Sequence, residues 1–127
     1  MKKILIFGSG GLVGSAVKRT FESDDKYKVF TPLRNEVDLF SFGETYNFIN
    51  KINPDWIINC AAKVGGILAN NTYRTEFLIE NLKINLNILE SCMGNNNINI
   101  INLGSSCIYP LDAENPIKES SFMDGKL

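Results

Sequence analysis

The sequence contains no histidine and only three cysteines, Cys60, Cys92 and Cys107, which are widely spaced. Zinc sites in proteins are built from cysteine and histidine at short, regular spacings, so this pattern excludes a site of that kind and predicts no metal. An odd number of cysteines without a C-x-x-C pair is typical of a reducing compartment. We therefore expect a cytoplasmic protein.

Excess charge of one sign and long hydrophobic runs are also lacking. Thirteen basic and fourteen acidic side chains give a net charge of -1, with no block of like charge. Binding to a nucleic-acid backbone requires clustered cations, so we expect no nucleic-acid partner. The apolar run that follows Met1 stops at Gly8, too early for a secretion signal, and no run approaches the roughly 18 residues that span a bilayer. We expect no membrane partner.

The composition is that of a globular chain. Hydrophobic residues make up 44% of the 127 residues and charged residues 21%, which excludes disorder throughout and fits one domain. Short apolar runs alternate with segments of helical periodicity. The predicted strands are residues 3–7, 27–31, 56–60 and 98–103, and the predicted helices are 12–23, 42–53 and 74–94.

This alternation predicts an α/β fold with a Rossmann-like parallel sheet and helices on both faces, truncated at about four to five strands. Periodicity disappears from Leu111 onward. We therefore expect residues 1–110 to form the Rossmann-like domain and residues 111–127 to form a loop or tail.

Two predicted helices carry further signals. Ser41-Phe42-Gly43-Glu44 has the spacing of a capping box, in which the serine and glutamate side chains each accept a hydrogen bond from a backbone amide. The helix at 74–94 carries an apolar stripe made of Leu78, Leu82, Leu86, Leu89 and Met93, with Ile84, Ile88 and Cys92 beside it. The sixteen asparagines of the chain are given no functional role at this stage.

A glycine-rich turn joins the first strand to the first helix. Gly8-Ser9-Gly10-Gly11-Leu12-Val13-Gly14 has the order G-x-x-G-x-x-G. Gly8 permits a tight turn, Gly11 lets the backbone approach a diphosphate, and Gly14 lets the helix lie close to the sheet. The helix N-terminus then offers free amides and a partial positive charge. We predict that residues 8–14 bind a dinucleotide; the alternative is a glycine-rich turn with no ligand.

The residue that follows the second strand bears on the choice of dinucleotide. An NAD site usually has an acidic residue there, which binds the ribose 2′-hydroxyl. This chain has Thr31, Pro32, Leu33 and then Arg34. A guanidinium suits a 2′-phosphate, so the sequence favours NADP(H), with Arg34 as a ligand. The alternative is a solvated surface arginine.

Ligands of open α/β sheets bind beyond the carboxyl ends of the strands, so the segments there form the candidate site. Asp38-Leu39 is suited to contact adenine, or else Asp38 is a loop residue before a helix. Ala61 and Ala62 are small enough to let a cofactor ribose approach. Gly104-Ser105-Ser106-Cys107 places hydroxyls and a thiol where a carbonyl oxygen can be held and a proton moved.

Four segments together carry a family resemblance. The glycine turn, Ala-Ala-Lys-Val-Gly-Gly at 61–66, Ala-Asn-Asn-Thr-Tyr at 69–73 and Gly-Ser-Ser-Cys-Ile-Tyr-Pro at 104–110 resemble the GDP-L-fucose synthases, which are extended short-chain dehydrogenases/reductases. The resemblance covers the whole chain but only the N-terminal part of the family's length. It implies NADPH as cofactor and GDP-4-keto-6-deoxy-D-mannose as substrate, converted to GDP-L-fucose by 3,5-epimerisation and 4-keto reduction.

The resemblance also implies roles for single residues. Ser105 is expected to hydrogen-bond the keto oxygen, and Cys107 to act as base or acid in the epimerisations; an inert cysteine is the alternative for Cys107. Lys63 is expected at the substrate, with a solvated loop cation as the alternative. The remaining implied contacts are Val64 and Gly65 with substrate, and Leu103, Gly104, Ser105 and Ser106 with cofactor. Family members pair through helices that include the one at 74–94, which suggests a homodimer.

The sequence departs from the family in its central catalytic pair. No tyrosine is followed at i+4 by lysine, and the family's catalytic histidine is missing. The family usually has proline where this chain has Arg74. We therefore expect the 127-residue chain to be inactive alone. Two alternatives to the N-terminal part of a GDP-L-fucose synthase are another NAD(P)-dependent nucleotide-sugar epimerase or dehydratase, and a non-catalytic dinucleotide-binding module.

Overall fold

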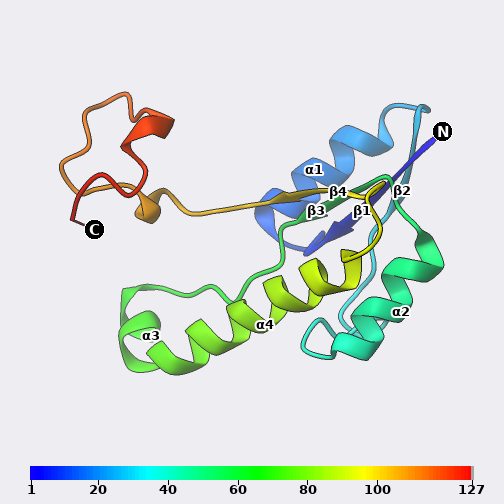
Figure 1. Cartoon of the computed structure of the whole chain (residues 1–127), viewed down its shortest axis with the longest axis horizontal. Helices are drawn as coiled ribbons and strands as arrows, with labels where there is room; N and C mark the ends of the chain where they lie inside the picture. The colour runs from blue at the N-terminus through cyan, green and yellow to red at the C-terminus, as the bar shows by residue number, and fades with distance from the viewer. Residues whose placement is uncertain (127) are drawn as a thin grey trace.

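A single parallel sheet forms the centre of the computed structural model, which describes residues 1–126 (Figure 1). Its strands are β1 (Lys2–Phe7), β2 (Tyr27–Phe30), β3 (Trp56–Asn59) and β4 (Asn99–Asn102). Their order is β2-β1-β3-β4, and every neighbouring pair is parallel. After β1 the chain forms β2 on one side of β1 and then crosses to form β3 on the other side. A topological switch point therefore lies between β1 and β3. This confirms the predicted Rossmann-like sheet.

Helices cover both faces of the sheet. They are α1 (Leu12–Glu22), α2 (Phe42–Ile52), α3 (Ile67–Thr72) and α4 (Arg74–Cys92). Helix α1 packs on β1 and β2 from one side, while α2 and α4 pack against each other on the opposite side (Figure 1). Within residues 1–126, no helix combines the length and the apolar character needed to cross a membrane.

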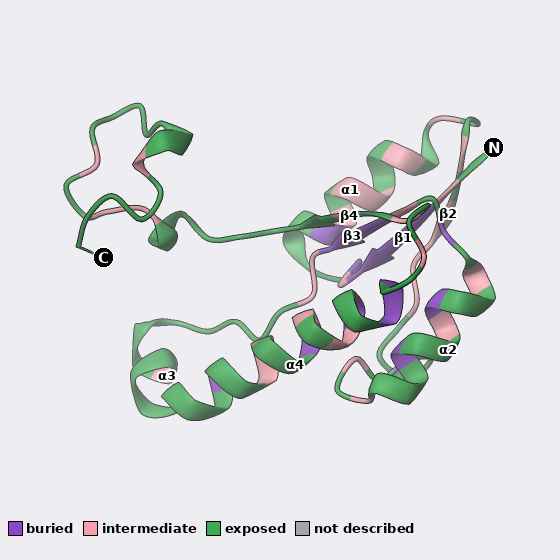
Figure 2. Ribbon diagram, in the orientation of Figure 1, coloured by how far each residue is buried: buried purple, intermediate pink, exposed green. Residues whose placement is uncertain are grey.

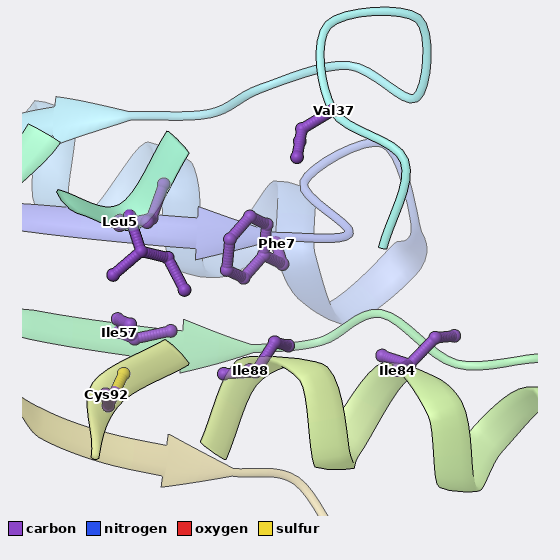
Figure 3. Packing of buried hydrophobic residues seen from close by; sticks show 8 residues of the cluster. Leu5, Phe7, Val37, Ile57, Ile84, Ile88 and Cys92 are labelled. Atoms are coloured by element: carbon purple, nitrogen blue, oxygen red, sulfur yellow. The ribbon is translucent and has the colours of Figure 1, made fainter. Parts of the chain in front are cut away.

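The apolar residues of β1 alternate between two buried clusters because successive side chains of a strand point to opposite faces. Leu5 and Phe7 pack with residues of α2 and α4, including Ile49 and Ile88 (Figure 3). Ile4 and Ile6 pack with Ile58 and with side chains of α1 on the other face. Burial is therefore concentrated in the central strands β1 and β3 and in the helix surfaces that face them (Figure 2).

The predicted capping box of α2 is half formed. Ser41 Oγ accepts a bond of 3.3 Å from the Glu44 amide, as expected. The Glu44 carboxylate accepts instead from the amide of Asp38, at 3.0 Å. The prediction was wrong for Glu44 because the Ser41 amide already donates to the Asp38 carbonyl within a tight turn.

Helix α4 buries the residues beside the predicted leucine stripe rather than the stripe itself. Its buried residues include Phe77, Ile84, Ile88 and Cys92. The stripe of Leu78, Leu82, Leu86, Leu89 and Met93 is 49–78% exposed. In addition, the chain forms the short helix α3 directly after Gly66, in a segment for which the sequence pattern predicted no helix.

The chain beyond β4 folds on itself, away from the sheet (Figure 1). It contains two short 3₁₀ helices, η1 (Ser106–Ile108) and η2 (Glu119–Ser121). The Leu111 amide donates to the Lys126 carbonyl at 2.9 Å, and the rings of Tyr109 and Phe122 meet edge to face. The predicted tail at 111–127 ends on Leu127, which lies outside the described residues.

Candidate functional site

The candidate site lies at the carboxyl ends of β1 and β3, beside the switch point of the sheet. Gly8 follows β1 with φ +76, a backbone conformation that favours glycine. A Cβ at Gly8 would stand 2.6 Å from the backbone nitrogen of Ala61 and from the carbonyl carbon of Cys60. The glycine turn and the turn after β3 are therefore in direct backbone contact.

Gly14 holds α1 close to this turn. A Cβ at Gly14 would stand 2.1 Å from the carbonyl oxygen of Gly8, so no larger side chain fits there without movement. The Gly11 amide donates to the same carbonyl, at 3.1 Å. A Cβ at Gly10, by contrast, would meet nothing within 4 Å. Close packing therefore requires glycine at 8 and 14, whereas Gly10 faces open space.

The first amides of α1 have no partner within the helix. Gly11 caps the helix in an extended conformation without a side-chain hydrogen bond, and the first turn carries no acidic residue. The amides of Leu12, Val13 and Gly14 precede the first intrahelical bond, which the Ser15 amide makes to Gly11. Ser9, at the base of the turn, is 8% exposed. The geometry matches a cradle for an anionic diphosphate.

The segment that follows β2 is held by its own side chains. The Glu36 carboxylate accepts from the Leu33 amide at 2.7 Å, and Val37 is buried in the core. Asp38 Oδ1 accepts from the Phe40 amide at 2.9 Å, which is the bonding of a loop aspartate before a helix. Arg34 lies exposed in the turn between them.

Leu39, the neighbour of Asp38, is half-buried and packs against the cluster between the sheet and α2 and α4. Its carbonyl accepts a bond of 2.8 Å from Asn87 of α4. The segment that carries Arg34 is therefore anchored on both the sheet and α4, and the guanidinium stands at its exposed rim.

The loop after β3 is anchored to α4 through Lys63. The Asn81 side chain accepts from the Lys63 amide at 2.8 Å and donates to the Lys63 carbonyl at 3.0 Å. The Lys63 ammonium pairs with Glu80 at 3.3 Å and lies 5.9 Å from the centre of the Phe77 ring. The structure therefore directs the Lys63 side chain along α4.

The neighbours of Lys63 differ in their surroundings. Ala61 is half-buried and Ala62 is exposed, whereas Val64 is 81% exposed. A Cβ at Gly65 would stand 2.9 Å from the Phe77 ring, which explains glycine there by close packing. The backbone of the loop is fixed, and most of its side chains face solvent.

The segment after β4 begins beside the site and then leaves it. The Leu103 amide donates to the Asn59 carbonyl, which extends the pairing of β3 and β4. Ser105 Oγ accepts from the Cys107 amide at 3.2 Å and caps η1. Gly104, Ser106 and the Cys107 thiol are exposed. Beyond Leu103 the chain runs outward from the sheet (Figure 1).

The three thiols differ in their surroundings. Burial raises the pKa of Cys60 and of Cys92, because removal of water disfavours the thiolate. Cys107 is the exposed thiol of the three.

Sequence reasoning missed a group of asparagine side chains that join the strand ends to α4. Asn59, at the end of β3, hydrogen-bonds both Asn85 of α4 and Asn102 of β4. Asn85 in turn donates to the carbonyl of Asn81. The i, i+4 spacing of Asn81 and Asn85 and the place of Asn59 at a buried strand end were visible in the sequence, but only the fold brings them together.

Comparison with known proteins relates the chain to nucleotide-sugar enzymes. A sequence model of the NAD dependent epimerase/dehydratase family matches residues 4–126. The chain is 37% identical to a GDP-L-colitose synthase of Yersinia pseudotuberculosis, over 98% of this chain and 40% of that protein. It is 36% identical to the GDP-L-fucose synthase of Escherichia coli (strain K12), over 99% of this chain and 39% of that protein. The chain thus spans about 40% of the length of these relatives.

Solved structures give the same relationship. The chain superposes on the protein DdhaC with a TM-score of 0.90 and 33% identity, covering 99% of this chain and 36% of that one. It superposes on a GDP-L-fucose synthetase of Naegleria fowleri bound to NADP with a TM-score of 0.81 and 28% identity, covering 98% of this chain and 37% of that one. A GDP-D-glycero-L-gluco-heptose synthase of Campylobacter jejuni, solved in the presence of NADPH, gives a TM-score of 0.88 at 29% identity, covering 99% of this chain and 37% of that one.

Proposed function

The chain belongs to the NAD dependent epimerase/dehydratase family, and we propose that it is the NADP(H)-binding, amino-terminal part of a GDP-L-fucose synthase. The reaction proposed for the whole enzyme converts GDP-4-keto-6-deoxy-D-mannose to GDP-L-fucose by 3,5-epimerisation and 4-keto reduction. The observation that carries this proposal is the end-to-end match of the chain to GDP-L-fucose synthases, over 99% of its length at 36% and 40% identity.

The glycine turn fits the diphosphate of the cofactor. Gly8 and Gly14 bring the turn, the loop after β3 and α1 into contact, and any side chain at these two positions would fill the contact. The free amides of Leu12 and Val13 can donate to phosphate oxygens, and the first turn of α1 has no carboxylate to repel them. Ala61 and Ala62 leave room for a ribose beside the turn. Bound NADPH supplies a hydride for the reduction of a keto carbon.

Arg34 is proposed to select NADP(H) over NAD(H). It is exposed at the end of the β2 segment, and a guanidinium can pair with a 2′-phosphate but gains little from a 2′-hydroxyl. Asp38 and Leu39 are proposed to lie near the adenine. For Asp38 the contact falls to its second carboxylate oxygen, because Oδ1 accepts from the Phe40 amide, the Asp38 amide donates to Glu44 and the Asp38 carbonyl accepts from the Ser41 amide.

Calorimetric titration of the chain with NADPH and with NADH tests this proposal. We expect NADPH to bind more tightly, and the Arg34→Ala variant to lose about tenfold in NADPH affinity with NADH affinity unchanged, because one charge-assisted contact contributes about 1.5 kcal/mol. Arg19→Ala, which removes an arginine from the last turn of α1, is the matched control. An unchanged NADPH preference in Arg34→Ala removes Arg34 from the site, and binding of neither dinucleotide contradicts the proposal as a whole.

The proposed chemistry of the segment after β4 rests on two side chains. The Ser105 hydroxyl holds the keto oxygen of the substrate, and the Cys107 thiol gives and takes protons next to that carbonyl. Protons beside a carbonyl can be removed when fixed donors hold the developing enolate oxygen. Leu103, Gly104 and Ser106 are proposed to line the cofactor, and residues 63–65 to contact the substrate. Since the chain has no Tyr-x-x-x-Lys pair and no histidine, we expect no turnover from these 127 residues alone.

A second candidate function keeps the chemistry and changes the sugar. The GDP-L-colitose synthase matches this chain at 37% identity, and several structures that superpose on it belong to reductases or synthases of GDP-linked heptoses. Assay of the complete gene product with NADPH and GDP-4-keto-6-deoxy-D-mannose separates the two candidates. Formation of GDP-L-fucose supports the first candidate, and its absence favours the second.

We also propose that the chain forms a homodimer through α4 and resides in the cytoplasm. The exposed stripe of α4 presents five large apolar side chains on one helix. Contiguous apolar patches that are exposed on a protein surface mark association sites. For the location, the support is the three free cysteines, since free thiols persist in a reducing compartment.

A further inference from the structure

Asn59 uses both N–H donors and the oxygen of its side-chain amide. The residue ends β3 and is 3% exposed. Its Nδ2 donates to Asn85 Oδ1 at 3.1 Å and to Asn102 Oδ1 at 2.7 Å, and its Oδ1 accepts from the Ala61 amide at 3.0 Å. Two donated bonds and one accepted bond tie three separate parts of the fold, namely α4, β4 and the loop after β3.

On one side, this amide fixes the turn that supports the glycine cradle. Ala61, which donates to Asn59, is the residue whose backbone nitrogen would stand 2.6 Å from a Cβ at Gly8. The adjacent Cys60 amide donates to the Phe7 carbonyl at 3.0 Å, which holds the same turn against β1. A shift of the Ala61 backbone therefore moves one wall of the proposed diphosphate site.

On the other side, the amide fixes the end of β4. Asn102 is the last residue of that strand, and the amide of the next residue, Leu103, donates to the Asn59 carbonyl at 3.2 Å. Asn59 thus holds β4 through both its main chain and its side chain. The direction in which the chain then leaves the sheet decides where Ser105 and Cys107 lie.

We propose that Asn59 is a positioning residue that couples the diphosphate cradle to the Ser105–Cys107 segment, through its bonds to Ala61 and Asn102. The inference rests on the proposed function, which assigns diphosphate binding to the glycine turn and substrate chemistry to the Ser105–Cys107 segment. The coupling between these two parts is itself a property of the chain without ligand. An amide is suited to this position because it donates twice and accepts once. Leucine provides none of these bonds, and alanine at 102 removes one acceptor.

Hydrogen exchange measured by NMR on the 127-residue chain tests the coupling. Asn102 is exposed, so Asn102→Ala should fold. In this variant we expect the ratio of the Ala61 exchange rate to the Ile6 exchange rate to rise about fivefold. A change of this size corresponds to the loss of one neutral hydrogen bond. Ile6 is fully buried in β1 and reports global opening. In Asn59→Leu the same ratio should rise, and adding Asn102→Ala to it should change nothing further.

The matched control is Asn50→Ala, which removes an asparagine of α2 whose Nδ2 donates to the Tyr46 carbonyl at 2.8 Å, outside this group of bonds. Its ratio of Ala61 to Ile6 exchange should equal that of the wild type. Equal acceleration of both amides in Asn102→Ala indicates a general loss of stability and overturns the proposal. An unchanged Ala61 rate in that variant overturns it as well.

A second measurement connects the coupling to cofactor binding. NADPH should slow alkylation of Cys107 by iodoacetamide in the wild type and in Asn50→Ala, and should protect it less in Asn102→Ala at saturating NADPH. Equal protection in all three proteins overturns the coupling. If the wild type binds no NADPH, the proposed function fails, and the exchange measurement alone decides on Asn59.

Discussion

At the scale of single residues, the close packing around the glycine turn explains why the turn is glycine-rich. The carbonyl of Gly8 accepts from Gly11 and faces the Cα of Gly14, so the turn and the start of α1 form one compact unit. At Gly8 the positive φ disfavours a side chain, and at Gly14 the neighbouring backbone leaves no space for one. The sequence motif therefore has a structural cause within the chain as well as a proposed ligand.

The Gly14→Ala variant measures this packing. The new Cβ would stand 2.1 Å from the Gly8 carbonyl oxygen, so the turn has to move. We expect the free energy of unfolding to fall by about 1–3 kcal/mol, the usual cost of overpacking, and NADPH affinity to fall with it. Gly43→Ala is the control, because a Cβ there meets nothing within 4 Å. Urea unfolding of both variants gives the values; equal stability of the two contradicts the packing argument.

The cysteines provide a second residue-scale prediction. Burial raises the pKa of Cys60 and Cys92 above the ordinary value of 9.0. Above pH 9 the unfolded chain therefore binds fewer protons at these thiols than the folded chain, so the free energy of unfolding should decline as pH rises past 9. Chemical unfolding at pH 8 and at pH 10 measures the decline. The Cys60→Ala, Cys92→Ala double variant should show a smaller decline, and an identical one contradicts this assignment.

The asparagine bonds show the limit of sequence reasoning at this scale. The glycine turn could be predicted because its residues are contiguous and each glycine has a local reason. Asn59, Asn85 and Asn102 are far apart in the chain, and an asparagine satisfies its amide equally well in solvent. Only the parallel arrangement of β3 and β4 beneath α4 brings these three side chains together.

At the scale of elements, the strands and the long helices could be predicted from hydrophobic periodicity, with ends within about two residues. Helix α3 could not, because six residues are too few to show a helical period and they follow a glycine pair. The stripe of α4 shows a related limit. Periodicity finds apolar faces, but Leu82 and Ile84 lie on nearly opposite sides of one helix, and the sequence does not say which of them the sheet covers.

The exposed stripe of α4 gives the prediction that belongs to this scale. In a homodimer through α4, a Leu82→Glu, Leu86→Glu variant places charge in the interface. Sedimentation velocity should show the wild type as a dimer and the variant shifted to monomer, with a dissociation constant raised at least tenfold, since each buried leucine contributes about 2 kcal/mol. Leu111→Glu changes an exposed leucine of the tail and should leave the dimer intact. A monomeric wild type at every concentration refutes the dimer.

At the scale of the whole molecule, the two faces of the sheet are covered unequally. On the side of α1, a hollow of about 300 Å³ is lined by apolar residues that include Phe21, Trp56, Ile58 and Ile101. Ile101, in β4, is 43% exposed. Parallel sheets usually have helices over both faces along their whole width. Composition and periodicity predicted the layers, but they do not measure how far each layer extends.

The whole arrangement depends on one claim, that amides at the N-terminus of α1 bind a dinucleotide diphosphate beside the switch point of the sheet. An NMR titration of the ¹⁵N-labelled chain with NADPH tests it most directly. The account predicts that the largest shifts occur at the amides of Gly10 to Gly14 and of Ala61, with smaller shifts at Arg34. Shifts that are absent there, or that centre on another part of the fold such as the hollow at Trp56, would contradict the account.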